Sequence, residues 1–265
     1  MRVRLRAVLI LTALLAGGAV VLAFTVVPST AQKQQVQDAG RVAEAYERDL
    51  EQSIDELGAY VVKRRFENAT NYQKLYDQVT ERMDTIPTIP KEGTTAYGRK
   101  HSREYRTAAS RRSLELVQFE RFTTFLQNRI IPRQEFVDAG VDLVQVNPRK
   151  LLEGFTVQFS GEALRTEVVP AYRKARKKLL DQKPAAEDAE LARDLKRYAD
   201  DTIKMTRGGA DDIDAGRGFF FEFGNKPDLL LRRLEDTQRA IAAEVSTQVD
   251  AIDTSGGAPA GGSAV

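Results

Sequence analysis

Apolar residues recur at alternating steps of three and four along most of the chain, the spacing that places them on one face of an α-helix. The first stripe lies between Gln32 and Ile86 and consists of Val36, Ala39, Ala43, Tyr46, Leu50, Ile54, Leu57, Val61, Tyr72, Tyr76, Val79, Met83 and Ile86. The helix-poor sequence "NATN" at residues 68–71 predicts a kink or a break. The stripe resumes in phase beyond it, so a single helix of roughly 80 Å is the alternative. Pro87 and Pro90 predict a loop afterwards.

The same spacing predicts five further helices, which cover residues 105–130, 135–146, 164–179, 191–205 and 227–253. Pro132 is expected to stop the first of them, and Pro170 to kink the third or to start its regular part. Because a one-sided apolar stripe must be buried against another, the pattern predicts a mainly α fold, an antiparallel bundle of long amphipathic helices. The stripe of residues 36–61 would also suit a seam between two copies of the chain.

Two phenylalanine-rich segments change the period from helical spacing to alternation by two. In residues 155–159 and 219–223 the apolar side chains are Phe155, Val157 and Phe159 in the first, and Phe219, Phe221 and Phe223 in the second. We predict that the two segments pair as one small two-stranded β-ribbon. Phe155, Phe159, Phe219, Phe221 and Phe223 are candidates for core packing, for the lining of a small-molecule pocket, or for an exposed contact with a membrane or a partner.

The N-terminus has the pattern of a membrane anchor. Three arginines fall within residues 1–6, and residues 7–27 form a run of 21 uncharged residues closed by Pro28. At about 1.5 Å per residue this run spans roughly 30 Å, the thickness of the hydrocarbon core. The positive-inside rule places residues 1–6 in the cytoplasm and the helical domain, residues 28–253, outside. The alternative is a secreted protein cleaved near Ala31, and the small-residue tail of residues 254–265 is expected to be disordered.

Composition narrows the chemistry. The chain has no cysteine and one histidine, which argues against thiolate metal sites, disulfides and nucleophile–base pairs, so we expect no enzyme, no metal and no cofactor. Beyond the N-terminal arginines, residues 28–265 carry 37 basic and 38 acidic side chains. This net charge of about −1 lacks the electrostatic footprint of a nucleic-acid-binding protein.

One basic block departs from this balance. Its members, Arg173, Lys174, Arg176, Lys177 and Lys178, occupy one arc of a predicted helix, opposite Leu164, Val168, Tyr172, Ala175 and Leu179. Because the next predicted helix is acid-rich, the simplest interpretation is an antiparallel hairpin whose charged faces neutralise each other. The block is otherwise a candidate surface for an anionic partner: lipid headgroups, an acidic envelope polymer or an acidic protein.

These features favour a single-pass membrane protein whose extracytoplasmic helical domain serves as a structural or accessory subunit, or as a scaffold, through contacts with another membrane or envelope protein. The alternative is a sensor-like helical bundle that encloses a small ligand. An envelope enzyme that uses carboxylates is the third hypothesis.

Overall fold

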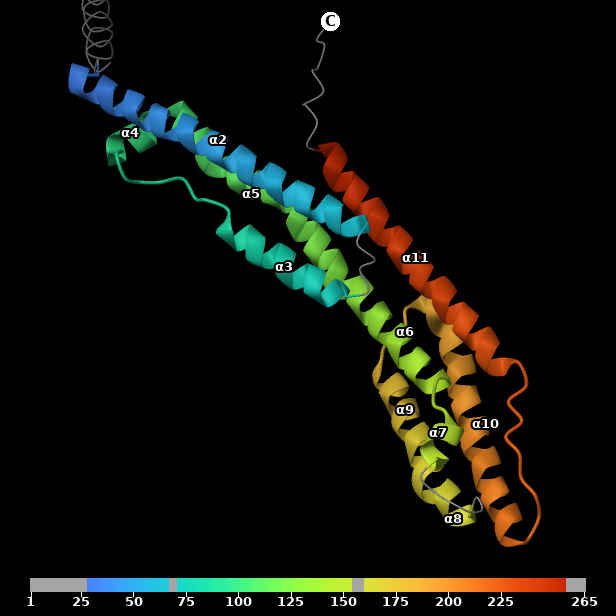
Figure 1. Cartoon of the computed structure of the whole chain (residues 1–265). Coiled ribbons are helices and arrows are strands. Elements are labelled where there is room, and N and C mark those ends of the chain that lie inside the picture. Colours follow the sequence, from blue (N-terminus) through green and yellow to red (C-terminus); the bar gives the residue numbers. More distant parts are fainter. Residues whose placement is uncertain (1–27, 67–70, 154–159, 256–265) are drawn as a thin grey trace, which may run out of the picture. The chain divides into compact units, whose positions relative to one another are not determined.

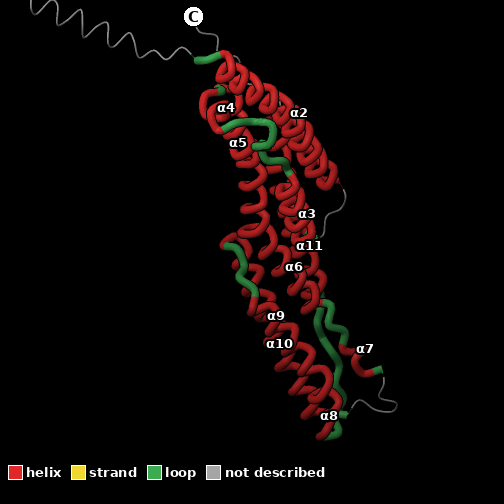
Figure 2. The backbone as a smooth tube through the Cα atoms, turned by 90° about the vertical axis from the view of Figure 1, so that its left-hand side faces the viewer, coloured by secondary structure: helices red, strands yellow, loops and turns green. Residues whose placement is uncertain are grey.

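The computed structural model describes residues 28–66, 71–153 and 160–255, and the described chain is mostly helical (Figure 1, Figure 2). Its elements are α2 (Thr30–Phe66), α3 (Tyr72–Thr85), α4 (Ala96–His101), α5 (Arg103–Phe125), the π-helix η1 (Leu126–Ile130), α6 (Ile131–Val144), α7 (Pro148–Leu152), α8 (Gly161–Ala163), the π-helix η2 (Leu164–Val168), α9 (Val169–Asp181), the 3-10 helix η3 (Ala186–Asp188), α10 (Ala189–Asp214) and α11 (Lys226–Ser255). The predicted mainly α class and helical bundle are confirmed.

Within these ranges no helix is long and apolar enough to cross a membrane. The predicted anchor, residues 7–27, lies outside the described residues. Helix α2 begins at a capping box, in which the Ser29 amide donates to Gln32 Oε1 (2.8 Å) and the Gln32 amide donates to Ser29 Oγ (3.2 Å).

The described chain divides into two compact units. The first contains α2 up to Gln52, α4 and α5 up to Leu114, together with the loop that starts at Pro87. The Tyr46 hydroxyl donates to Pro87 O (3.3 Å), and the Tyr105 hydroxyl donates to Pro90 O (3.1 Å). Both tyrosine rings are buried, so they hold the proline-rich loop against the helices of this unit.

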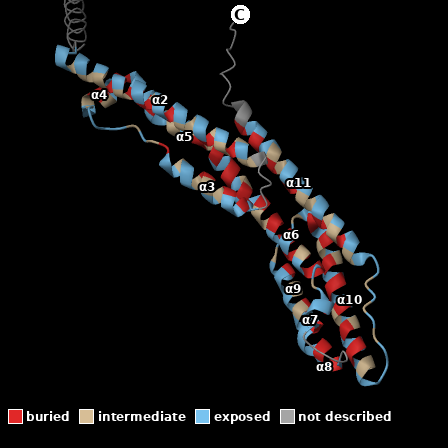
Figure 3. Cartoon of the chain, in the orientation of Figure 1, coloured by how far each residue is buried: buried red, intermediate tan, exposed pale blue. Residues whose placement is uncertain are grey.

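The second unit contains the rest of α2, α3, the remainder of α5 and everything that follows. Its centre is an antiparallel bundle of α6, α9, α10 and α11, in which buried positions follow one side of each helix (Figure 3). The fully buried side chains of this bundle include Phe136, Leu143, Tyr172, Leu195, Leu234 and Ile241.

The first predicted helix does not continue in phase past residues 68–71. Helix α2 ends at Phe66 and the chain reverses, so that α3 lies against the end of α2. The Tyr60 hydroxyl donates to Gln78 Oε1 of α3 (2.6 Å), and the Arg82 guanidinium lies 4.0 Å from the Tyr60 ring centroid. In a straight helix, residues 18 positions apart would be separated by about 27 Å. The break was therefore correctly predicted, whereas the 80 Å helix was wrong.

Pro132 does not stop a helix, which corrects another prediction. The π-helix η1 directly precedes α6, and the Ile131 amide donates to Leu126 O, five residues back. A proline is tolerated in the first turn of a helix because it needs no donor there, and the widened π turn gives its ring room. The same device recurs at η2, where the Val169 amide donates to Leu164 O before Pro170. The two segments, "LQNRIIP" and "LRTEVVP", share the pattern of a leucine, three variable residues, two β-branched residues and a proline.

The predicted β-ribbon is absent from the described chain. Residues 219–223 form an extended segment without strand pairing, and residues 155–159 lie outside the described residues. The alternation in the second segment is nevertheless present, because Phe219, Phe221 and Phe223 are half-buried while Phe220 is 83% exposed. Alternation by two shows only that a segment has one covered face and one exposed face. Here the covered face packs on helix α10 rather than on a second strand.

Candidate functional site

The basic block lies on α9, as the helical spacing predicted. Tyr172 and Leu179 are buried in the bundle, whereas Arg173, Lys174, Lys177 and Lys178 are exposed. Tyr172 fixes the rotation of the helix, because its hydroxyl donates to Val146 O (3.1 Å) and its ring is fully covered. Burial raises the pKa of Tyr172 well above its ordinary value of 10.0. The inward anchors therefore determine which side chains of α9 face solvent.

Two members of the basic block form ion pairs. Arg176 donates to Asp200 of α10, with Nε 2.6 Å from Oδ1, as the predicted neutralisation requires. Lys178 instead donates to Asp142 of α6, with Nζ 2.6 Å from Oδ2, and this hydrogen bond raises the pKa of Lys178. Arg173, Lys174 and Lys177 make no ion pair with any residue that the structure describes. The neutralising hairpin is thus only partly formed.

Two of the unpaired cations, Lys174 and Lys177, line a shallow groove. Its floor is formed by Ala171 and Ala175, and its walls carry Lys174, Lys177, Lys178, Asp142 and Asp181. We call this feature the basic groove. Leu180, 47% exposed, follows it on α9. Two small residues at an i, i+4 spacing allow another backbone to approach closely.

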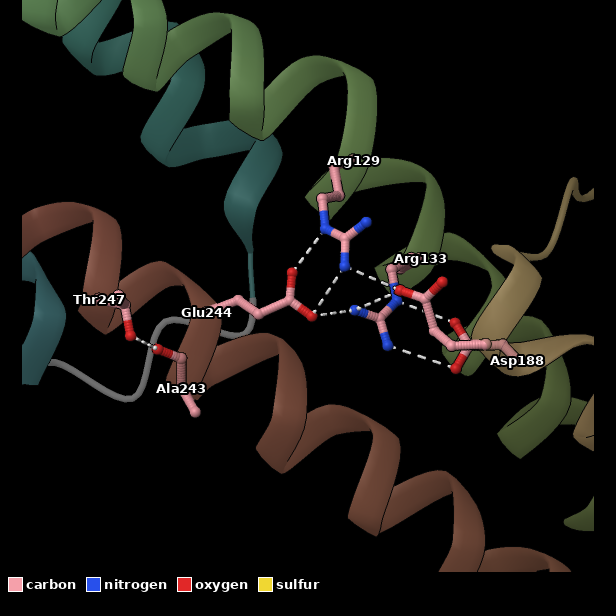
Figure 4. A network of polar contacts seen from close by, with 7 residues as sticks. Arg129, Arg133, Asp188, Ala243, Glu244 and Thr247 are labelled. Atoms are coloured by element: carbon pink, nitrogen blue, oxygen red, sulfur yellow. Dashed lines mark hydrogen bonds and ion pairs between the residues drawn. The ribbon is translucent and has the colours of Figure 1, made fainter.

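Two of the acids expected to neutralise α9, Glu187 and Asp188, bind other residues. Asp188 and Glu187, just before α10, bind Arg133 and Arg129 at the η1–α6 junction, and Glu244 of α11 binds both arginines (Figure 4). The Nε of Arg133 lies 2.8 Å from Asp188 Oδ2, and its Nη1 lies 2.5 Å from Glu244 Oε1. We call these five side chains the arginine network. It connects η1 and α6 with η3 and α11.

Burial makes the arginine network specific. The side chains of Arg133 and Asp188 are 5% and 6% exposed, so each charge depends on the other for solvation. The hydrogen bond from Arg129, whose Nε lies 2.6 Å from Glu244 Oε2, is the main reason that the pKa of Glu244 falls below its ordinary value. Every acid of this network is a hydrogen-bonded partner of an arginine, which suits a structural role.

The aromatic candidates form a ladder on α10. The Phe219 and Phe221 rings meet edge to face at 5.0 Å, those of Phe221 and Phe223 stack at 5.5 Å, and the Phe223 ring lies 6.3 Å from that of Tyr198. Phe219 lies directly on Gly209, where a Cβ atom would have no room. Phe155 and Phe159 lie outside the described residues. The structure therefore brings Phe219, Phe221 and Phe223 together as a half-buried layer.

Metal chemistry receives no support from the described residues, among which no group of three or more His, Asp or Glu side chains could hold an ion. Residues 211–214 form the last turn of α10, and Asp211 and Asp214 bind Arg165. The lone histidine, His101, stacks on Tyr97 with ring centroids 4.2 Å apart.

Sequence reasoning missed the arginine network, because its five members come from three separate segments and no local pattern pairs them. One signal was present: each member of the repeated leucine-to-proline pattern marks a π turn, and Arg129 lies within the first. π turns are frequent at specialised sites. Comparison with protein-family models, with curated proteins and with solved structures finds no match to this chain.

Proposed function

We propose that the protein is a membrane-anchored, extracytoplasmic accessory or scaffold subunit that holds an acidic segment of a partner protein in the basic groove of α9. The observation that carries this proposal is the density of exposed, unpaired charge on α9. Arg173, Lys174 and Lys177 lie within five residues, and none of them forms an ion pair with a described residue, whereas the adjacent Arg176 and Lys178 do.

The form of the groove favours a protein over a lipid surface. Asp142 and Asp181 stand in its walls beside the lysines, so positive and negative charges lie close together, and a uniformly anionic surface matches this pattern less well than a folded segment with its own arrangement of charges. An acidic helix of a partner can place its carboxylates against Lys174 and Lys177. Its other side chains, which carry no negative charge, would then face Asp142 and Asp181. Ala171 and Ala175 give such a helix close access, and Leu180 offers an apolar contact at the end of the groove.

Rigidity of the surface also supports a docking role. Helix α9 is held from inside by Tyr172 and Leu179, and α6 and the start of α10, on which it packs, are joined by the arginine network. A pre-organised surface loses less conformational entropy when a partner binds.

The test is a pull-down of the full-length chain, tagged after Val265, from native membranes in mild detergent. We expect a stoichiometric partner with an acidic surface helix, and an intact Met1 on N-terminal sequencing. The triple variant R173E/K174E/K177E should lose that partner, and recovery of the wild type should fall with added salt because these charges are exposed.

The matched control is K204E/R207E/R232E, which changes net charge equally at exposed cations of α10 and α11 that form no ion pair with a described residue. It should recover the partner as the wild type does. Equal recovery with both variants would refute the basic groove as the docking site. Retention of the full-length chain by anionic vesicles, with no protein recovered, would replace the partner protein by a lipid surface.

A further inference from the structure

A second surface groove lies between α10 and α11 and shares no lining residue with the basic groove. It has a volume of about 250 Å³, and the residues that line it recur about once per helical turn along both helices. Helix α10 contributes Arg197 and Tyr198, and helix α11 contributes Leu229 and Leu230. The volume lies just below the 300–1,000 Å³ typical of sites for drug-sized ligands, so a smaller molecule would fit.

Ion pairs close both ends of this groove. At one end Arg233 donates to Asp194, with Nη1 2.5 Å from Oδ2, and at the other Lys226 Nζ lies 3.7 Å from Asp201 Oδ2. These contacts join α10 to α11 and occupy four of the five charged side chains that line the groove.

The floor of the groove is an apolar surface with a fixed aromatic ring. Tyr198 is 5% exposed, so its ring is held in place by the core around it. The side of its ring is supported by Phe223, the last member of the aromatic ladder. Leu230 is buried beside it, whereas Leu229 remains 48% exposed, which is unusual for a leucine that lines an interhelical groove.

One cation in the groove lacks a partner. Arg197 is exposed and makes no ion pair with any residue in the described ranges. The acids within one helical turn of it, Asp194, Asp200 and Asp201, are bound to Arg233, Arg176 and Lys226. A guanidinium group binds a carboxylate through two parallel hydrogen bonds. The groove thus offers an apolar floor and a single vacant carboxylate-binding group at its wall.

We propose that the groove between α10 and α11 binds a small apolar monocarboxylate, with its hydrophobic body on Tyr198, Leu229 and Leu230 and its carboxylate on Arg197. An aromatic or branched aliphatic acid has the required size and shape. A dicarboxylate would place its second charge against the apolar floor, and an amine would have to displace Arg233 from Asp194 or Lys226 from Asp201, so both are disfavoured.

The test uses 4-fluorophenylacetate as the probe and the full-length protein in detergent micelles, with binding followed by the broadening of the fluorine NMR signal. For a ligand of this size we expect a dissociation constant of about 1 mM. The neutral amide of the same shape, 4-fluorophenylacetamide, should bind about tenfold more weakly, because it cannot form the charge-assisted pair with Arg197. The amide also corrects for partition of the probe into the micelle.

Variants then locate the site. R197Q should weaken the binding of the acid about tenfold and leave the amide unchanged, and L229D should abolish the binding of both probes. The control R193Q removes an exposed cation of the same helix that does not line the groove, and it should bind the acid as the wild type does. Helical circular dichroism of each variant verifies its fold. The inference is overturned if R197Q retains wild-type affinity, if the amide binds as tightly as the acid, or if neither probe broadens.

Discussion

Arg133 and Asp188 form a two-bonded ion pair in the interior of the second unit, with Nε 2.8 Å from Oδ2 and Nη2 3.3 Å from Oδ1. The pair joins α6 to the turn before α10, and Glu244 adds α11 to it. Because both side chains are almost fully covered, removal of Arg133 would leave the Asp188 carboxylate buried without its counter-ion.

The first prediction follows from that burial. R133M should lower the free energy of unfolding by about 3–5 kcal/mol, because Asp188 would stay buried without its counter-ion. The double variant R133M/D188L should recover most of that loss, since an apolar pair requires no desolvation of charge. Urea unfolding monitored by circular dichroism provides both values. R239A, which breaks the exposed pair with Asp236, is the control and should change stability little. If the double variant were as unstable as R133M, the unpaired charge of Asp188 would not be the cause of the lost stability.

The second prediction concerns acid stability. The pKa of Glu244 is lowered in the folded protein, chiefly by the hydrogen bond from Arg129, so the unfolded chain binds a proton at this group more readily. Its contribution to stability is therefore fully present above the ordinary pKa of 4.5 and is lost as pH falls through the folded value. E244Q should be less stable than the wild type at neutral pH, and the difference should narrow below about pH 4.5.

The pH dependence is measured as urea midpoints across an acid series. E235Q replaces an exposed carboxylate of the same helix that forms no ion pair with a described residue, and it should follow the wild-type curve. Parallel curves for E244Q and the wild type at all pH values would show that Glu244 does not contribute through its charge.

The third prediction concerns alkaline stability. Burial raises the pKa of Tyr172 and of Tyr198 above the ordinary value of 10.0, so the folded state keeps both phenols protonated where the unfolded chain would ionise them. This stabilisation is complete below pH 10 and is lost as pH rises above it. In an alkaline pH titration, the tyrosinate absorbance that develops last should therefore rise at the same pH at which the helical circular dichroism is lost. In Y172F/Y198F that late absorbance should shrink by two of the eight tyrosines; a late phase of unchanged size would refute the assignment.

The fourth prediction compares two adjacent glycines of α10. At Gly209 an added Cβ would collide with the Phe219 ring, whereas at Gly208 nothing lies within 4 Å. G209A should destabilise the protein by about 1–3 kcal/mol, as overpacking does. G208A should stabilise it by about 0.5–1 kcal/mol, because alanine loses less conformational entropy in a helix. Thermal unfolding distinguishes them, and G209A/F219A should regain part of the loss. Equal effects of the two single variants would show that Phe219 does not rest on Gly209.

The helices were predictable from the sequence because each buries a stripe that repeats with the helical period. The apolar stripe of α2 shows what the helical period predicts and what it does not. Ala39, Ala43, Tyr46, Leu50, Leu57 and Val61 are buried as predicted, but within the chain itself. A seam between two copies through residues 36–61 would therefore require α2 to leave its present contacts. The reversal after Phe66 could not be read from phase, since a hairpin preserves the stripe as well as a straight helix does.

The candidate surfaces were predictable only where one element carries them. The outward position of Arg173, Lys174 and Lys177 follows from the period of α9, whereas the choice of Asp142 rather than an acid of α10 for Lys178 depends on packing. The groove beside Tyr198 and the arginine network require side chains from helices distant in sequence. The Phe219–Phe223 alternation was read correctly as two faces and wrongly as a strand, because pattern does not reveal what covers a face.

The π turn before Pro132 carries a spare residue. A turn closed from residue 131 back to residue 126 contains one residue more than an α-helical turn. Deletion of Gln127 or Asn128 would let this turn close as an ordinary α-helical turn, and the residues that follow would keep nearly the same face. Arg133 would then still point towards Asp188. A one-residue deletion in the regular part of α6 would instead rotate everything behind it by about 100°. The π turn is therefore a point at which this helix can lose a residue without changing which side chains meet in the arginine network.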